Sequence, residues 1–423
     1  MAKIKTIKAR EILDSRGNPT VETVVILDDN SQAEASIPSG ASLGKYEAIE
    51  LRDNDPQRYQ GMGVLKAVNN VNQIITPNLL GMEAKEQIKI DKLLIELDGT
   101  PNKSKLGANA LLSVSQGIVE AAAVSQKLPT YKYLASLYGF KPTKKMPGPT
   151  FNLINGGKHG AGNLDFQEFH LIPSTAKSYS EALRIAEEIY QTLEQVLIKH
   201  GAVHSIGDEG GYAPNLFTNA DALELLMEAI KKANYDFNHD VFLGLDTAAT
   251  FFYKNGKYKI RDRTVPMQTN DLVNFYSELN QQYSLFSLED GFYEDDWDGW
   301  VKIKQELAET IIVGDDLLAT NKERVKEAIK RKACDAILVK PNQIGTISET
   351  IYVILAAREA DWKIIVSHRS GETNDDFIAD FAVGVNADFT KFGAPARGER
   401  VAKYNRLLEI EEELNENKYQ LSN

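Results

Sequence analysis

Ile311-Ile312-Val313-Gly314-Asp315 and, 25 residues later, Ala336-Ile337-Leu338-Val339-Lys340 decide the fold of this chain. Each is a short apolar run, which is typical of a buried strand, and each ends in a side chain that can do chemistry. An interval of 25 residues has room for one strand, one helix and two loops. Repetition of such a unit predicts a parallel sheet with helices between its strands.

Four further runs repeat this pattern in both directions along the chain. They lead to Asp246, Glu289, His368 and, more weakly, Lys391, and successive run ends lie 43, 26, 25, 28 and 23 residues apart. The long first interval also holds a hairpin-like stretch at residues 252–260. Functional side chains at the carboxyl ends of several strands favour a closed (β/α)8 barrel over an open sheet, because these ends meet at one mouth of a barrel.

Two earlier apolar stretches, residues 150–154 and 166–172, supply the first two strands of this barrel. Helical segments near residues 178–199 and 219–234 follow both of them. The element order is therefore ββαα(βα)6, which departs from the usual alternation of strand and helix.

The region before the barrel has a different character. A β-branched run at residues 20–27 predicts a strand, and small apolar residues at helical spacing predict a helix at residues 105–125. Residues 139–149 hold three prolines and two glycines, which indicates a linker. We predict an α/β protein with a smaller N-terminal α+β domain at 1–138, a linker at 139–149, and a C-terminal (β/α)8 barrel of ββαα(βα)6 order at 150–423.

Composition narrows the class of protein. The 423 residues are 43% hydrophobic, which is enough apolar surface for a folded core. The net charge of −12 disfavours nucleic-acid partners, and no apolar run approaches the ~20 residues of a membrane span. Residues 1–11 contain no apolar signal core, and the single cysteine, Cys334, excludes an intrachain disulfide. These features predict a cytoplasmic protein with a small-molecule substrate and no membrane insertion.

Three carboxylates, Asp246, Glu289 and Asp315, follow successive predicted strands. Taken singly, each is more simply a helix N-cap or a surface charge. Three carboxylates at one mouth repel one another unless a cation lies among them, and all-oxygen ligands suit Mg²⁺ or Mn²⁺. Lys340 and Lys391 belong to the same rim, where a neighbouring cation lowers a lysine pKa and makes it a candidate base. The alternative for each lysine is a simple ion pair with one of the carboxylates.

Other candidate groups come from loops and from the second strand. Glu168 follows the apparent second strand, and Glu209 lies in Gly207-Asp208-Glu209-Gly210-Gly211. Paired glutamates can keep one of them protonated as an acid, although Glu209 alone also reads as a turn residue. His368-Arg369-Ser370 offers a phosphate clamp, and His159 is a further candidate for the cleft. A base, an acid and a divalent metal beside an anion clamp suit proton abstraction α to a carboxylate, followed by loss of a β group.

These residues lie in motifs that together resemble the enolase family, the phosphopyruvate hydratases, along essentially the whole chain. The motifs are Glu11 to Thr20, Ser39-Gly40-Ala41-Ser42, Gly207 to Gly211, Ser287-Leu288-Glu289-Asp290, Gly314-Asp315-Asp316-Leu317, Lys340 to Gly345, Ser367 to Thr373 and Ala402 to Asn405. The resemblance implies reversible dehydration of 2-phospho-D-glycerate to phosphoenolpyruvate in glycolysis. It also implies a homodimer or an octamer of dimers.

The resemblance assigns a role to each matched position. Lys340 matches the base that removes the C2 proton, and Glu209, with Glu168 beside it, matches the acid that helps hydroxide to leave. Two Mg²⁺ ions are implied, the second bound together with substrate. The first ion matches Asp246, Glu289 and Asp315, the second matches Ser42, and substrate contacts match His159, His368, Arg369, Ser370 and Lys391.

Several positions depart from the family pattern. Leu43 stands where Thr is usual, Gly160 where Ala is common, and Phe392 and Gly398 where Thr and Ser are usual. None of them is an implied metal ligand or the base, so they concern loop closure and rate more than reaction type.

Two alternatives to the hydratase can be compared with the sequence. A racemase or cycloisomerase of the same superfamily often carries a Lys-x-Lys base on the second barrel strand, but this stretch reads Phe166-Gln167-Glu168. A cell-surface role in binding plasminogen is often tied to a terminal lysine, whereas this chain ends Leu421-Ser422-Asn423. The sequence supports neither alternative.

Overall fold

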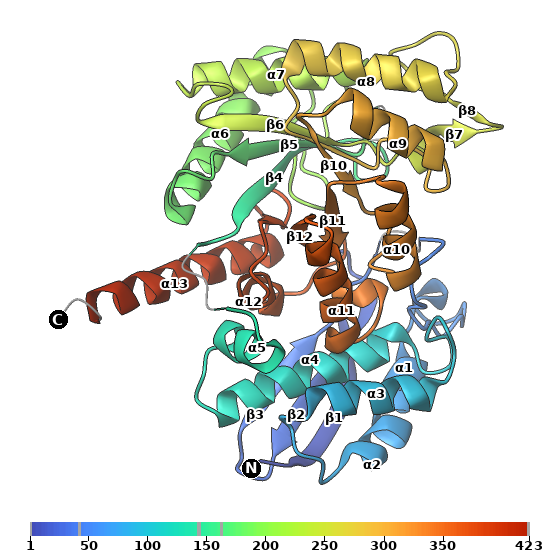
Figure 1. Ribbon diagram of the computed structural model, residues 1–423, viewed down its shortest axis with the longest axis vertical. Helices are drawn as coiled ribbons and strands as arrows, with labels where there is room; N and C mark the ends of the chain where they lie inside the picture. Colours follow the sequence, from blue (N-terminus) through green and yellow to red (C-terminus); the bar gives the residue numbers. More distant parts are fainter. Residues whose placement is uncertain (1, 41–43, 142–144, 161–163, 421–423) are drawn as a thin grey trace.

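The N-terminal part of the chain is a three-stranded antiparallel sheet covered by helices. The computed structural model describes residues 2–40, 44–141, 145–160 and 164–420, the side chains of 417–420 excepted. The sheet order is β1-β2-β3, and the region lies at the lower end of the molecule in Figure 1. Its main elements are β1 (Ile4–Leu13), β2 (Pro19–Leu27), β3 (Gln32–Ser36), α1 (Leu65–Asn69), α2 (Thr76–Leu79), α3 (Gln87–Asp98), α4 (Ala108–Ser125) and α5 (Thr130–Tyr138).

Helix α4 packs directly on β2 and β3, and small residues make this close approach possible. A Cβ on Gly117 would lie 2.9 Å from Val25 Cγ2, so only glycine lets the helix lie this near β2. Nearly every α4 side chain is buried, since the helix is covered on its other side as well. The predicted strand at 20–27 and helix at 105–125 are both present and end where predicted, but the strand starts one residue earlier and the helix three residues later.

The C-terminal part is a closed eight-stranded barrel in the order β10-β11-β12-β13-β4-β5-β6-β9. Along the chain its elements follow the predicted order ββαα(βα)6, which confirms the predicted barrel. The strands are β4 (Gly148–Asn155), β5 (Glu168–Pro173), β6 (Val241–Asp246), β9 (Ser287–Glu289), β10 (Ile311–Gly314), β11 (Ala336–Val339), β12 (Lys363–Ser367) and β13 (Phe389–Lys391). The predicted hairpin also forms, as β7 (Tyr253–Lys254) and β8 (Lys257–Tyr258).

In the described residues eight α-helices accompany these strands, and polar N-cap side chains start several of them. Thr218 and Asp221 form a capping box before the helix that starts at Asn219, and Ser178, Asn321 and Thr346 cap the helices that start at Tyr179, Lys322 and Ile347. No helix in the described ranges is both long and apolar enough to cross a membrane. The helices are α6 (Tyr179–Lys199), α7 (Asn219–Lys232), α8 (Thr269–Tyr283), α9 (Trp297–Glu306), α10 (Lys322–Arg331), α11 (Ile347–Glu359), α12 (Phe377–Gly384) and α13 (Gly398–Gln420).

Strand β5 runs antiparallel to both of its neighbours, β4 and β6. No crossover helix is assigned in the described residues between β4 and β5, so the chain turns back and β5 returns in the opposite direction. Glu168 was predicted to follow the second strand, and this placement is wrong: it is the first residue of β5. Because β5 is reversed, its first residue lies at the mouth where the parallel strands end.

The two parts of the chain meet near that mouth. Ser39 and Gly371 exchange backbone hydrogen bonds of 2.7 and 2.9 Å, which join the N-terminal segment to the loop after β12. Further along the contact, the buried Asp91 carboxylate accepts a 2.9 Å hydrogen bond from the backbone N–H of Ser348 on α11. Strand β4 begins inside the segment predicted as a linker. The predicted domain limits themselves stay a prediction.

Candidate functional site

A cavity opens at the barrel mouth and encloses roughly 540 Å³ of empty space, part of it open to solvent. Ten of the twelve predicted site residues line it. Glu289 is buried next to it, in contact with Lys391, and Ser42 lies outside the described residues. The ten are His159, Glu168, Glu209, Asp246, Asp315, Lys340, His368, Arg369, Ser370 and Lys391.

Lys391, the last residue of β13, is surrounded by carboxylates. Its Nζ lies 2.8 Å from Glu289 Oε1, 3.0 Å from Asp246 Oδ2 and 3.2 Å from Glu168 Oε2. Burial disfavours the ammonium form, but these carboxylates outweigh burial and hold the pKa of Lys391 well above its usual value. The ion-pair alternative for this lysine is therefore realised, with three carboxylates instead of one.

The donor set fits a divalent cation. Four buried carboxylates, those of Glu168, Asp246, Glu289 and Asp315, contact the two ammonium groups of Lys340 and Lys391, and Glu168 also lies against the rings of His159 and His170. Burial and the neighbouring Asp246 raise the pKa of Glu289 well above its usual value, because negative charge is in excess. Oxygen donors with excess negative charge are the ligands that Mg²⁺ prefers.

The three predicted ligands converge on the lysines more than on one another. Among the described residues, the groups whose ligand atoms all lie within 4.8 Å include Asp290–Asp315–Asp316 and His159–Glu168–Glu209, but not Asp246, Glu289 and Asp315 together. Asp246 and Glu289 instead contact Lys391, and Asp315 contacts Lys340.

Lys340 follows β11 immediately, and its Nζ lies 2.5 Å from Asp315 Oδ2. Burial lowers the pKa of Lys340, but the Asp315 carboxylate leaves it raised overall. The sequence predicted the opposite direction, on the assumption of a nearby cation. The charge of Asp315 contributes most to this rise, and coordination of that carboxylate by a cation would offset it.

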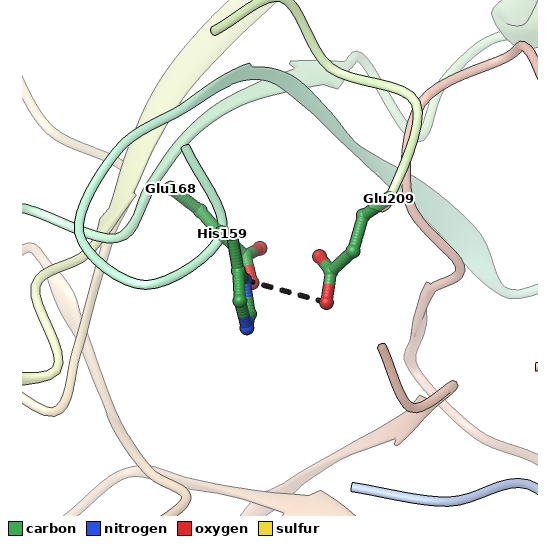
Figure 2. A group of neighbouring side chains, drawn as sticks. All are labelled: His159, Glu168 and Glu209. Atoms are coloured by element: carbon green, nitrogen blue, oxygen red, sulfur yellow. Dashed lines mark ion pairs between the residues drawn. The ribbon is translucent and has the colours of Figure 1, made fainter. Parts of the chain in front are cut away.

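His159, Glu168 and Glu209 converge from three segments, as Figure 2 shows. His159 Nδ1 lies 3.3 Å from Glu168 Oε1 and 3.3 Å from Glu209 Oε1. Burial and Glu168 raise the pKa of Glu209, but His159 and His368 leave it lowered, and Lys391 keeps that of Glu168 well below its usual value. Burial lowers the pKa of His159, yet Glu209 leaves it raised. The chain's own charges thus favour a proton on His159, where the sequence predicted a protonated glutamate.

The predicted phosphate clamp lies beside this group. Ser370 Oγ donates a 2.8 Å hydrogen bond to Glu209 Oε1 and lies 3.0 Å from His159 Nε2. Arg369 Nη1 donates to Glu47 Oε2 at 2.9 Å and to Asn342 Oδ1 at 3.1 Å. The guanidinium is therefore held in one orientation at the cavity wall.

Sequence reasoning missed several side chains that shape the cavity. Glu47 lies beyond the 39–44 loop and carries no local signal of its own. Asn342 and Gln343 stand next to Lys340, and Gln343 Nε2 donates to Asp315 Oδ1 at 3.2 Å. That adjacency was a usable signal, because residues just after a barrel strand face the mouth.

Three of the four departures from the family pattern, Gly160, Phe392 and Gly398, lie in the described part of the chain, and none of the three lines the cavity. Phe392 is fully buried and packs against Tyr404 at 6.2 Å between ring centroids. A Cβ at Gly398 would meet nothing within 4 Å, whereas a Cβ at Gly160 would lie 2.4 Å from the Asn155 carbonyl oxygen. Gly160 is thus required by a close backbone approach, and Leu43 lies outside the described residues.

The fold is an α/β barrel whose second strand is reversed. Carboxylates and lysines gather at its mouth, where barrel enzymes have their active sites. Two family models match this chain. The model described as "Enolase, N-terminal domain" matches residues 4–134, and that described as "Enolase, C-terminal TIM barrel domain" matches residues 143–422. The chain therefore belongs to the enolase family.

Proposed function

We propose that this chain catalyses the reversible, Mg²⁺-dependent dehydration of 2-phospho-D-glycerate to phosphoenolpyruvate and water. Family membership supports the reaction class. The observation that carries the proposal is that one cavity presents the amine of Lys340, the carboxylate of Glu209 and the Arg369–Ser370 pair together. These are a base, an acid and an anion contact, the groups this elimination requires.

Lys340 is the proposed base that removes the C2 proton. Because Lys340 directly follows β11, its backbone is held at the barrel mouth, and the contact with Asp315 orients its amine. Burial favours the neutral amine, which is the form that accepts a proton. The charge of Asp315 opposes this, so ligation of Asp315 and activation of Lys340 belong together in the proposal.

Glu209, with Glu168 beside it, is the proposed acid side of the reaction. The charges around His159 raise its pKa, and its Nδ1 lies 3.3 Å from Glu209 Oε1, so His159 can supply a proton to Glu209. Asn152 Nδ2 and Ser370 Oγ donate to Glu209 at 3.0 and 2.8 Å, which stabilises the carboxylate left after proton delivery.

The anion contacts orient the substrate. Arg369 and Ser370 are proposed to bind the phosphate, with His159, His368 and Lys391 as further substrate contacts. Glu47 and Asn342 hold the Arg369 fork in place, so little side-chain entropy is lost on binding. The buried setting strengthens each charge–charge contact relative to water.

Asp246, Glu289 and Asp315 would hold the first Mg²⁺, and Ser42 would hold a second one that arrives with substrate. When bound, Mg²⁺ supplies charge stabilisation for the carboxylate whose negative charge increases as the C2 proton leaves. A cytoplasmic location and a homodimer or octamer of dimers complete the proposal, with no nucleic-acid partner.

The test is an absorbance assay for phosphoenolpyruvate formed from 2-phosphoglycerate, with and without Mg²⁺. We expect product only when the metal is present. No product with saturating substrate and Mg²⁺, from protein shown to be folded, would overturn the proposal.

A further inference from the structure

Arg400 on α13 is fully buried behind the candidate site, and its guanidinium donates four hydrogen bonds. Nη1 donates to His368 Nδ1 at 2.7 Å and to the Arg369 carbonyl at 2.6 Å. Nη2 donates to the carbonyls of Ser370 at 2.6 Å and of Asp208 at 3.2 Å. One side chain thus ties the 368–370 segment to the loop that carries Glu209.

The contact with His368 fixes which ring nitrogen bears the proton. A guanidinium has only donors and does not lose its charge, so His368 Nδ1 must accept with its lone pair. A neutral ring then carries its proton on Nε2. That nitrogen lies 3.5 Å from Glu209 Oε2, so the ring presents its N–H to the carboxylate.

The charged groups around His368 favour the neutral ring. Burial lowers its pKa, and Arg400 adds to this, while Glu209 and Glu168 oppose it, and the pKa stays below the usual value. The backbone N–H of His368 donates to the Lys391 carbonyl at 3.0 Å, which pins the residue to the strand end.

Close packing keeps the three groups together at Gly393. This residue has φ +87, and a Cβ there would lie 2.7 Å from the Glu209 carbonyl oxygen, 3.0 Å from His368 Cε1 and 3.2 Å from Arg400 Cδ. Glycine is therefore required both by the backbone conformation and by the space.

We propose that Arg400 is a positioning residue that holds His368 as a neutral ring protonated on Nε2, so that Glu209 always faces a hydrogen-bond donor. His368 then cannot accept a proton from Glu209. Glu209 therefore exchanges protons only with His159 and with the substrate. The catalytic consequence rests on the proposed function, whereas the protonation of the ring does not.

Long-range ¹H–¹⁵N correlation NMR on the full chain labelled with ¹⁵N-histidine tests this directly. The chain has six histidines, and His368→Gln assigns the signal. We expect an unprotonated Nδ1 and a protonated Nε2 throughout about pH 5 to 8, where an ordinary histidine titrates. A proton on Nδ1, or a ring that becomes doubly protonated in this range, would overturn the proposal.

Arg400→Met supplies the comparison, because it removes the donors at similar bulk. The His368 signal in this variant should titrate within that pH range or show mixed tautomers, and an unchanged signal in folded Arg400→Met protein would overturn the role of Arg400. If Arg400→Met does not fold, the variants His368→Gln and His368→Leu test whether Glu209 needs the N–H of His368. Gln at 368 keeps an N–H near the Nε2 position and Leu does not, so turnover of the Leu variant should be about tenfold lower than that of the Gln variant.

Equal turnover of the Gln and Leu variants at 368 would reject the donor role. The NMR outcome does not depend on any activity. A protonated Nε2 in a chain that forms no phosphoenolpyruvate would reject the proposed function and leave this inference standing. A proton on Nδ1 in a chain that does form phosphoenolpyruvate would reject this inference and leave the proposed function standing.

Discussion

Glu168 stands directly opposite Asp246 in the ladder between β5 and β6. One residue opens its strand and the other closes its strand, and they meet only because β5 is antiparallel. This pairing brings the glutamate group of the cavity next to the predicted metal ligands, with Lys391 Nζ between them at 3.2 and 3.0 Å. The reversed strand therefore brings Glu168, which lies beside the proposed acid Glu209, next to Asp246, a predicted metal ligand.

Lys340→Ala should abolish exchange of the C2 proton of 2-phosphoglycerate with solvent, because no other group is proposed to remove that proton. Loss of a positioned base costs about 10²–10⁴ in rate. Deuterium incorporation in D₂O, followed by NMR or mass spectrometry, measures it. Lys326→Ala is the matched control, since Lys326 lies on α10 with its side chain 56% exposed. Appreciable exchange in the Lys340 variant would remove it as the base.

Glu209→Gln should separate the two halves of the reaction. Proton removal at C2 does not require the acid, so exchange should persist while phosphoenolpyruvate formation falls by about 10²-fold or more. The two assays are run on the same preparation, with Glu323→Gln as control because that side chain is 76% exposed. Equal loss of exchange and turnover would contradict the assignment of Glu209 to the later step.

Mg²⁺ should stabilise the fold through Asp315 as well as support turnover. A ligand at 100 times its dissociation constant adds about 2.7 kcal/mol to the free energy of unfolding, which is visible as a rise in melting temperature. Asp315→Asn should remove most of this rise, whereas Asp298→Asn, at an exposed position on α9, should keep it. Turnover that survives excess chelator would refute the metal requirement.

Asp91 should make stability depend on pH between about 4 and 6. Burial raises the pKa of this carboxyl from 3.8 to about 6, despite hydrogen bonds from Ser348, Ser115 and Gln87. The folded state therefore disfavours the ionised form. The contribution of Asp91 to the free energy of unfolding falls as pH rises through this window, by roughly 3 kcal/mol, and is constant above it.

Urea unfolding of the wild type and of Asp91→Asn over a pH series measures this. The difference in stability, wild type minus variant, should shrink from pH 4 to pH 6. Asp298→Asn, at an exposed position, is the control for the substitution itself. A constant difference for Asp91→Asn would show that the carboxyl is not perturbed.

The sequence by itself determined the barrel, its element order and the candidate residues at the mouth. Apolar runs of strand length ending at Asp246, Glu289, Asp315, Lys340 and His368 are local features, and they require little knowledge of distant parts of the chain. The periodic spacing of those runs then limits the topology to a few alternatives. Motif resemblance added the roles expected of each residue.

Only the tertiary structure decided how those side chains pair and where their protons lie. The direction of β5 moved Glu168 from the end of a strand to its beginning. Asp315 raises the pKa of Lys340 against the effect of burial, and Glu209 raises that of His159, which favours a proton on His159 over the glutamate predicted from the sequence. Glu47, Arg400 and Gly393 come from segments that carry no chemical signal of their own. Charge–charge energies and close contacts depend on distances of a few ångström between residues far apart in the chain, which no local pattern encodes.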